Sequence, residues 1–248
     1  MEPLHLVALG LVGLSALGII IAAVLVGRKA PTFRDIPAFR QIRRAVSLVV
    51  EDGSRLHVSL GHGSLLTPFG ASALAGLSML RQLGESTSLS DRPSIATSGD
   101  GVLNLAAQDT LRAAHEALRI PQAFDVNRGQ LTGLTPFSYA AGALPIMRDN
   151  QISTNVLIGN FGLEVALLTE ASEREGATLA AASDNLPAQA VLYASSPNAL
   201  IGEELFAAGA YNQAGNFHIA SLLIQDILRW LLIAVLLIGA ILKALGVF

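Results

Sequence analysis

Cysteine is absent from the chain of 248 residues. This absence excludes disulfide bonds, cysteine-held iron–sulfur clusters and catalysis by a thiol. The sequence also lacks the G-x-S-x-G turn of serine hydrolases, and no Ser, His and Asp residues form a recognisable catalytic set. We therefore expect a protein that is not an enzyme, although the sequence leaves that question open.

Metal-ligand spacing is missing as well. Zinc sites combine several Cys and His ligands, commonly in closely spaced pairs. The chain has five histidines, and only His57 and His62 form a loose pair along the sequence. We expect neither a metal nor a cofactor.

Apolar residues, in contrast, make up 52% of the chain. Residues 6–27 carry no charge, and residues 227–248 are similarly apolar; about 20 such residues cross a hydrocarbon layer roughly 30 Å thick. We predict a first transmembrane helix within residues 1–27 and a second within residues 218–248. The alternatives are a cleaved signal peptide, which normally has Lys or Arg before its apolar core, and a buried C-terminal helix of a soluble domain.

Basic residues concentrate directly after the first apolar run. Six of the 16 Lys and Arg residues lie in residues 28–44, RKAPTFRDIPAFRQIRR. Lys and Arg near the end of a span favour the cytoplasmic side, and they also attract anionic lipid. This pattern predicts a two-pass protein of the plasma (inner) membrane, with both termini outside and the main domain cytoplasmic. The stretch itself is predicted to be a kinked juxtamembrane collar at the lipid interface, through Arg28, Lys29, Arg34, Arg40, Arg43 and Arg44.

The segment between the spans is acidic. Residues 45–226 contain eight Lys and Arg against 17 Asp and Glu. An acidic domain is repelled by nucleic acid, so we expect no nucleic-acid partner. The alternative account of the acidic excess is that it only provides solubility.

Strand and helix patterns alternate within this domain, predicted over residues 45–217. The stretch NVLIGNFGLEVALLTEASEREGATLAAASDN predicts a strand at 156–159, a helix at 163–175 and a strand at 178–182, which together make a right-handed βαβ unit. Alternating residues on both sides of Asp52-Gly53 predict a β-hairpin over 46–60. We expect an α/β, Rossmann-like fold with a largely parallel sheet and this hairpin at its edge.

The turn of the βαβ unit is the first candidate ligand site. Phosphate binds the N-terminal amides of the helix in such units, and an acidic residue about 20 positions later binds ribose. Gly159, Asn160, Gly162 and Asp184 roughly follow that layout, but one glycine of the G-x-G-x-x-G pattern is missing. The alternative is that Asp184 or Asn185 caps a helix.

The sequence TSGDG, residues 97–101, is a second candidate. Ser98 and Asp100 follow a predicted strand at the edge where parallel sheets bind ligands. Asp100 also directly precedes a predicted helix, so the alternative is an ordinary helix N-cap. We favour the cap.

Two short sequences repeat, QDTLR and QDILR, and each places Asp and Arg three residues apart on a helix. In the second copy, we predict that Asp226 and Arg229 pair where the helix enters the bilayer, with Trp230 beside them as an interface marker.

Four stretches carry a family resemblance: FRDIPAFRQIRRAV, IGNFGLEVALL, GEELFAAGAY and SLLIQDILRWLL. They resemble a family of uncharacterised bacterial membrane proteins with a domain of unknown function between two transmembrane helices. The resemblance implies the topology above and no activity.

Three classes of function remain open. Small residues in both apolar runs (Gly10, Gly18, Ala22, Ala240 and Ala244) permit close helix packing, and Leu205, Phe206 and Tyr211 are candidates for an exposed apolar surface. We expect a homo-oligomer that is anchored in the lipid bilayer by its two helices and has a structural or scaffold role. The alternatives are a sensor of a small molecule or nucleotide and, less favoured, an enzyme.

Overall fold

The computed structural model describes residues 3–27, 33–66, 70–149, 151–196, 199–212 and 215–245. Two units make up the chain, one from residues 1–33 with 213–248 and the other from residues 34–212. Arg28 and Lys29 of the predicted collar lie outside the described residues.

The first unit is a pair of apolar helices, α1 (Pro3–Val26) and α9 (Asn216–Ala244). Both are long and apolar enough to cross a membrane. Ala23 and Val26 of α1 and Ala220 of α9 are buried, and most other apolar side chains of the two helices are exposed. Such a pair has apolar residues all round, as the sequence pattern predicted.

The second unit is built on one sheet of five strands. The strands lie in the order β3-β2-β1-β4-β5, and every neighbouring pair is parallel. This order is that of a doubly wound, Rossmann-like α/β fold, so the predicted fold class is confirmed. The strands are β1 (Arg55–Gly61), β2 (Ile95–Ser98), β3 (Gly129–Leu131), β4 (Ile152–Asn160) and β5 (Thr178–Ser183).

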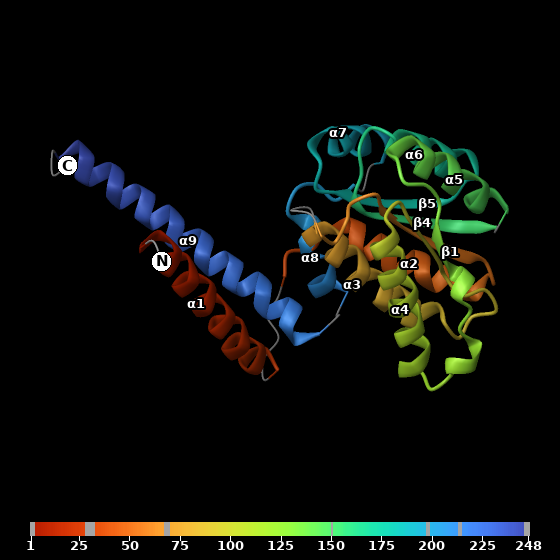
Figure 1. Cartoon of the computed structure of the whole chain (residues 1–248), viewed down its shortest axis with the longest axis horizontal. Helices are drawn as coiled ribbons and strands as arrows, with labels where there is room; N and C mark the ends of the chain where they lie inside the picture. The colour runs from red at the N-terminus through yellow and green to blue at the C-terminus, as the bar shows by residue number, and fades with distance from the viewer. Residues whose placement is uncertain are drawn as a thin grey trace. The chain divides into compact units, whose positions relative to one another are not determined.

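Helices cover both faces of the sheet (Figure 1). One layer contains α2 (Pro37–Glu51), α3 (Gly70–Thr87), α4 (Gly101–Ala117) and α8 (Glu204–Tyr211), and the other contains α5 (Pro136–Asp149), α6 (Val165–Arg174) and α7 (Leu186–Ser195). The single-turn helices η1 (Pro121–Ala123) and η2 (Val126–Arg128) join α4 to β3.

The two faces of the sheet differ in chemistry. On β1, Leu56, Val58 and Leu60 belong to the apolar core under α2, α3 and α4. The alternate residues His57 and Ser59 are equally buried but polar, and period-two alternation places them on the face toward α5. The polar residues of this strand are therefore inside the protein, where each needs a hydrogen-bond partner.

The predicted edge hairpin is wrong. Residues 46–50 belong to α2, in which Phe39, Ile42, Ala45 and Val49 recur at helical spacing and are buried. Strand β1 lies at the centre of the parallel sheet and does not pair with residues 46–50. Those residues are part of a helix that packs on the sheet. The alternation at 46–50 was too short to distinguish a strand from the amphipathic helix.

Residues 34–44 likewise belong to the α/β unit and do not form a separate collar. Pro37 occupies the first turn of α2, where a missing amide hydrogen costs nothing, and does not produce a kink. Arg40, Arg43 and Arg44 lie on the exposed face of this helix. The predicted βαβ unit is confirmed as β4-α6-β5, whereas the sequence pattern did not predict the three-residue strand β3.

Candidate functional site

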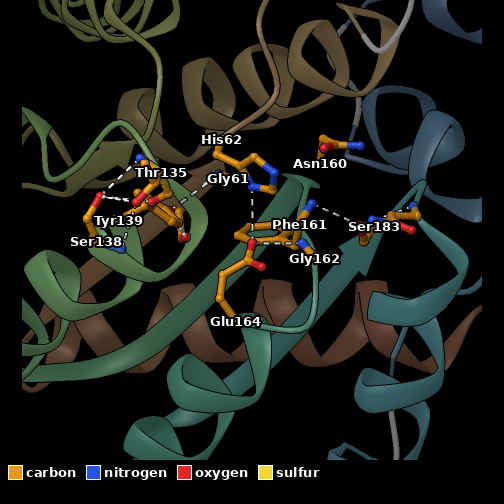
Figure 2. A network of polar contacts seen from close by, with 12 residues as sticks. Gly61, His62, Thr135, Ser138, Tyr139, Asn160, Phe161, Gly162, Glu164 and Ser183 are labelled. Atoms are coloured by element: carbon orange, nitrogen blue, oxygen red, sulfur yellow. Dashed lines mark hydrogen bonds and ion pairs between the residues drawn. The ribbon is translucent and has the colours of Figure 1, made fainter.

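The strand order reverses between β1 and β4, and open α/β sheets bind ligands at the carboxyl ends of the strands at such a point. Here the chain continues into His62, Gly63 and Ser64 after β1, which ends at Gly61, and into residues 161–164 after β4. Figure 2 shows the polar groups that these two turns bring together.

His62 and Glu164 form the centre of this site. Nδ1 of His62 lies 3.1 Å from Oε1 of Glu164, and Glu164 is 2% exposed. The Gly162 amide donates to the same carboxylate at 2.7 Å. Burial raises the pKa of Glu164, but the contacts with His62 and with backbone amides outweigh it, so the net pKa is below the ordinary value. Glu164 is therefore an ionised, nearly buried carboxylate.

This carboxylate changes what the turn can bind. In a dinucleotide site, the free amides at the helix N-terminus hold phosphate, but here the Gly162 amide already donates to Glu164. A fixed negative charge at the same place repels an anion. The arrangement suits a ligand that brings hydrogen-bond donors or positive charge better than it suits a phosphate.

Sequence reasoning missed both His62 and Glu164. Glu164 was assigned to the start of a predicted helix, and His62 was considered only as a zinc ligand. The available signal was the pair of glycines around His62 directly after a strand. Gly61 has φ of +74°, and a Cβ on Gly63 would lie 2.6 Å from Cβ of Asn160, so both glycines permit close approach of the two turns.

The residues predicted at the βαβ turn do lie together. Nδ2 of Asn160 donates to Oδ1 of Asp184 at 2.7 Å, and Ser183 Oγ accepts from the Phe161 amide at 3.2 Å. These contacts connect the ends of β4 and β5 beside Gly162. The Asp184 carboxylate therefore already accepts a hydrogen bond from Asn160 of the same chain.

Ser98 and Asp100 lie at the end of β2, on the same edge of the sheet. Oδ1 of Asp100 accepts from the Leu103 amide at 2.8 Å, which makes it the N-cap of α4. Ser98 Oγ donates to the Asp100 carbonyl at 3.3 Å. The structure therefore gives Asp100 the role of a helix cap.

A buried polar network runs under the site, between β1 and α5. Nδ1 of His57 contacts Oδ1 of Asn155 at 2.8 Å, and Nε2 contacts the Thr97 hydroxyl at 2.8 Å. Since an amide oxygen only accepts, Nδ1 must carry the hydrogen and Nε2 must accept from Thr97. Burial lowers the pKa of His57 to about 4, so it is neutral at pH 7.

The Tyr139 hydroxyl continues the network toward the site. It pairs closely with Ser59, lies 3.4 Å from Thr97, and accepts from the Gly61 amide at 3.3 Å. Burial raises the pKa of Tyr139, and the charge of Glu164 adds to that effect. A continuous set of buried polar groups thus extends from the middle of the sheet to the turn that holds His62.

Exposed apolar side chains also lie in the segments that follow the strands at this edge of the sheet. Five of them follow β1, β3, β4 and β5 at the carboxyl edge and are 61% to 82% exposed. We call this set the apolar rim: Leu66, Leu134, Phe137, Leu163 and Leu186. Large exposed apolar groups gathered at one edge are typical of a surface that another molecule covers.

The predicted apolar surface near the end of the α/β unit is not exposed as a whole. Leu205 is fully buried, Tyr211 stacks on Phe39 with 4.7 Å between ring centroids, and Phe206 alone is substantially exposed, at 39%. The first two pack in the core beside α2.

The basic residues predicted for the lipid interface have protein partners in three cases. Arg34 pairs with Glu204 at 2.5 Å, Arg40 pairs with Asp35 at 2.8 Å, and Arg43 donates to the Tyr211 carbonyl at 3.3 Å. Arg44 is exposed. These are surface contacts on the α/β unit, each worth little in water.

The Asp226 and Arg229 side chains lie 3.6 Å apart on α9, and Trp230 is 71% exposed. The first copy of the repeated sequence has the same geometry, with 3.4 Å between Asp109 and Arg112 on α4.

Within the described parts of the chain, no three His, Asp or Glu side chains gather as metal ligands would. His57 and His62 have different partners, Asn155 with Thr97 for the first and Glu164 for the second.

The fold defines a doubly wound α/β protein with two further apolar helices. The chain belongs to the family described as "Domain of unknown function (DUF6754)", whose model matches residues 4–248. No curated protein and no solved structure matches it. The expected family type, an uncharacterised domain of unknown function, is confirmed.

Proposed function

We propose that this protein is a membrane-anchored homo-oligomer with a structural or scaffold role, in which copies associate through the carboxyl edge of the α/β sheet. Helices α1 and α9 anchor it in the plasma (inner) membrane, and the α/β unit is cytoplasmic. The apolar rim is the observation that carries the proposal, because its five side chains are 61% to 82% exposed at one edge.

A second copy suits the rim for two reasons. Membrane anchoring holds all copies at one height, so weak lateral contacts between them are reinforced by their high local concentration. Two polar contacts at this edge lie within the chain: Nδ1 of His62 is 3.1 Å from Glu164, and Asn160 donates to Asp184 at 2.7 Å. An apolar surface beside paired polar groups can be covered without leaving charges unpaired.

The absence of cysteine provides a direct test of this contact. We expect Leu163→Cys to form a disulfide-linked dimer when the full chain is oxidised in lipid vesicles. The matched control is Leu89→Cys, because Leu89 is 72% exposed but lies before β2, at the opposite edge of the sheet. Equal cross-linking of the two variants, or none with Leu163→Cys at any lipid ratio, would contradict association through the rim.

The orientation rests on the excess of Lys and Arg after α1 compared with the outer flanks. A reporter fused after Gly215 should be active in the cytoplasm, and one fused after Phe248 should be active outside. The reverse pattern would place the α/β unit on the outer side.

A small-ligand sensor is the second candidate, and the His62 and Glu164 pair at the strand-order reversal favours it. The ionised carboxylate of Glu164 suits a cation or a molecule rich in hydroxyl or amino donors. Nucleosides offer such donors through ribose, whereas their phosphates would meet the negative charge of Glu164.

Thermal shift of the full chain in mild detergent tests the sensor proposal. A nucleoside should stabilise it more than the matching nucleotide does, and Glu164→Gln should reduce the shift. Asp184→Ala tests the earlier expectation that this carboxylate binds ribose. If no nucleoside, nucleotide or dinucleotide shifts the transition, the nucleoside form of the proposal is wrong.

A further inference from the structure

The packing of α1 against α9 sets the depth of the charged residues on α9. A Cβ added to Gly18 would lie 3.1 Å from Cδ1 of Ile224, and one added to Gly27 would lie 3.2 Å from Nδ2 of Asn216. Moving toward the end of α1 therefore means moving toward the start of α9. The two helices are antiparallel, and their levels can be read from the Gly18–Ile224 contact.

This register places the Asp226–Arg229 pair beside the middle of α1. Asp226 is two residues beyond Ile224, so it is level with Ala16; Arg229 is level with Gly13 by the same count. Residues 6–27 of α1 carry no charge, and Ala16 is at their centre. A bilayer that covers this run therefore places both charges near its midplane.

With the bilayer placed over the uncharged run of α1, the pair lies deeper than the interface position that the sequence predicts. The apolar run at 227–248 suggested that the pair lies where the second helix enters the bilayer. However, α9 begins at Asn216 and has 29 residues, which is about 43 Å at 1.5 Å per residue. The pair follows ten residues of helix, about 15 Å, and not the start of the helix.

Lipid does not suit the pair as the single chain presents it. The side chains of Arg229 and Asp226 are 48% and 64% exposed, and the hydroxyl of Ser15, at a similar level on α1, donates to the Leu11 carbonyl. Charged residues within transmembrane segments normally face other protein or a water-filled cavity, because hydrocarbon cannot solvate them.

We propose that the Asp226–Arg229 pair is an intramembrane contact between copies of this chain. This inference rests on the proposed membrane-anchored homo-oligomer and adds a second surface to it. Charge complementarity identifies the partner. In a second copy of the same orientation, Asp226 and Arg229 lie at the same two depths, which differ by only about 4.5 Å at 1.5 Å per residue. The long Arg229 side chain of one copy can therefore reach Asp226 of the next, and four charges combine without a net charge.

Trp230 tests the depth without any substitution, because it is the single tryptophan of the chain and directly follows Arg229. The full chain is reconstituted in vesicles whose lipids are brominated either near the middle of the acyl chain or near the headgroup. We expect stronger quenching of Trp230 fluorescence by the deep bromines. Stronger quenching by the shallow bromines would overturn the depth, and no quenching by either lipid would also contradict the proposed membrane anchoring.

Paired substitutions test the contact. Asp226→Ala with Arg229→Ala removes both charges and makes α9 more apolar, so insertion is retained, and association measured by energy transfer between labelled chains in vesicles should weaken roughly tenfold. Exchanging the charges (Asp226→Arg with Arg229→Asp) should restore association. The matched control is Asp109→Ala with Arg112→Ala, since that pair has the same spacing on α4, and it should have no effect.

The outcomes separate this inference from the proposed function. Wild-type chains that stay monomeric in vesicles contradict the homo-oligomer itself. Association that is equal in the wild type and in the double alanine variant of α9 leaves the homo-oligomer intact and overturns the intramembrane contact. Association that is lost in the α9 variant, kept in the α4 control and recovered on charge exchange supports it.

Discussion

Protonation of His57 should destabilise the α/β unit over a defined pH range. The imidazole is fully buried between Asn155 and Thr97, and burial lowers its pKa from 6.5 to about 4. Below pH 6.5 the unfolded chain binds a proton at this residue and the folded chain does not. Stability is therefore complete above pH 6.5, falls as the pH is lowered, and stops falling from this cause near pH 4.

The magnitude follows from the shift in pKa. Each unit corresponds to about 1.4 kcal/mol, so the fall from pH 6.5 to pH 4 totals about 3 kcal/mol, of which about 2 kcal/mol is reached by pH 5. A loss of this size is a substantial part of the usual free energy of unfolding of a domain, about 5–15 kcal/mol.

Pulse proteolysis in urea measures the effect on the full chain in mild detergent. The wild type should lose about 2 kcal/mol between pH 7 and pH 5, calculated as above. His57→Gln should start from lower stability and show a much smaller loss over the same range, because it has no titrating group there. Leu89→Ala is the control: Leu89 is 72% exposed and has no titrating group, so this change should keep the pH dependence of the wild type. Equal pH dependence in the wild type and His57→Gln would refute the reasoning.

Two further predictions concern the same sheet. Tyr139→Phe should lower the free energy of unfolding by about 1–2 kcal/mol, because the Gly61 amide and the Ser59 hydroxyl lose a buried partner; urea unfolding followed by pulse proteolysis checks this, and an unchanged midpoint would contradict it. Gly63→Ala should destabilise the unit by about 1–3 kcal/mol, since its Cβ would lie 2.6 Å from an Asn160 carbon. Gly101→Ala, with no atom within 4 Å of its Cβ, should be neutral or slightly stabilising in the same assay.

Local periodicity in the sequence was sufficient for much of the fold. The βαβ unit, which lies at 152–183, was predicted over 156–182 because a buried strand, an amphipathic helix that ends before Gly176 and a second strand follow one another with clear turn residues. Both apolar helices were predicted from long, strongly apolar runs. These features depend on neighbours in the sequence, so no knowledge of distant contacts is needed to find them.

Elements whose sequence pattern is very short, or fits a strand and a helix equally well, were not predictable in this way. Residues 46–50 alternate like a strand, and only the packing of α2 on the sheet shows that they are helical. Strand β3 has three residues, Gly129–Leu131, and it exists because β2 offers it a parallel partner. In both cases tertiary contacts override a weak local preference.

Some residues of the candidate site were likewise predictable from the sequence, and others were not. The sequence alone determined that Gly159, Asn160, Gly162 and Asp184 would lie near one turn, because they belong to one βαβ unit with fixed geometry. Only the tertiary structure decided that Glu164 faces His62, which is about one hundred residues earlier in the chain. That contact depends on β1 and β4 being neighbours at the centre of the sheet. Strand order arises from long-range packing, so the chemistry at the carboxyl edge emerges only when the whole sheet has formed.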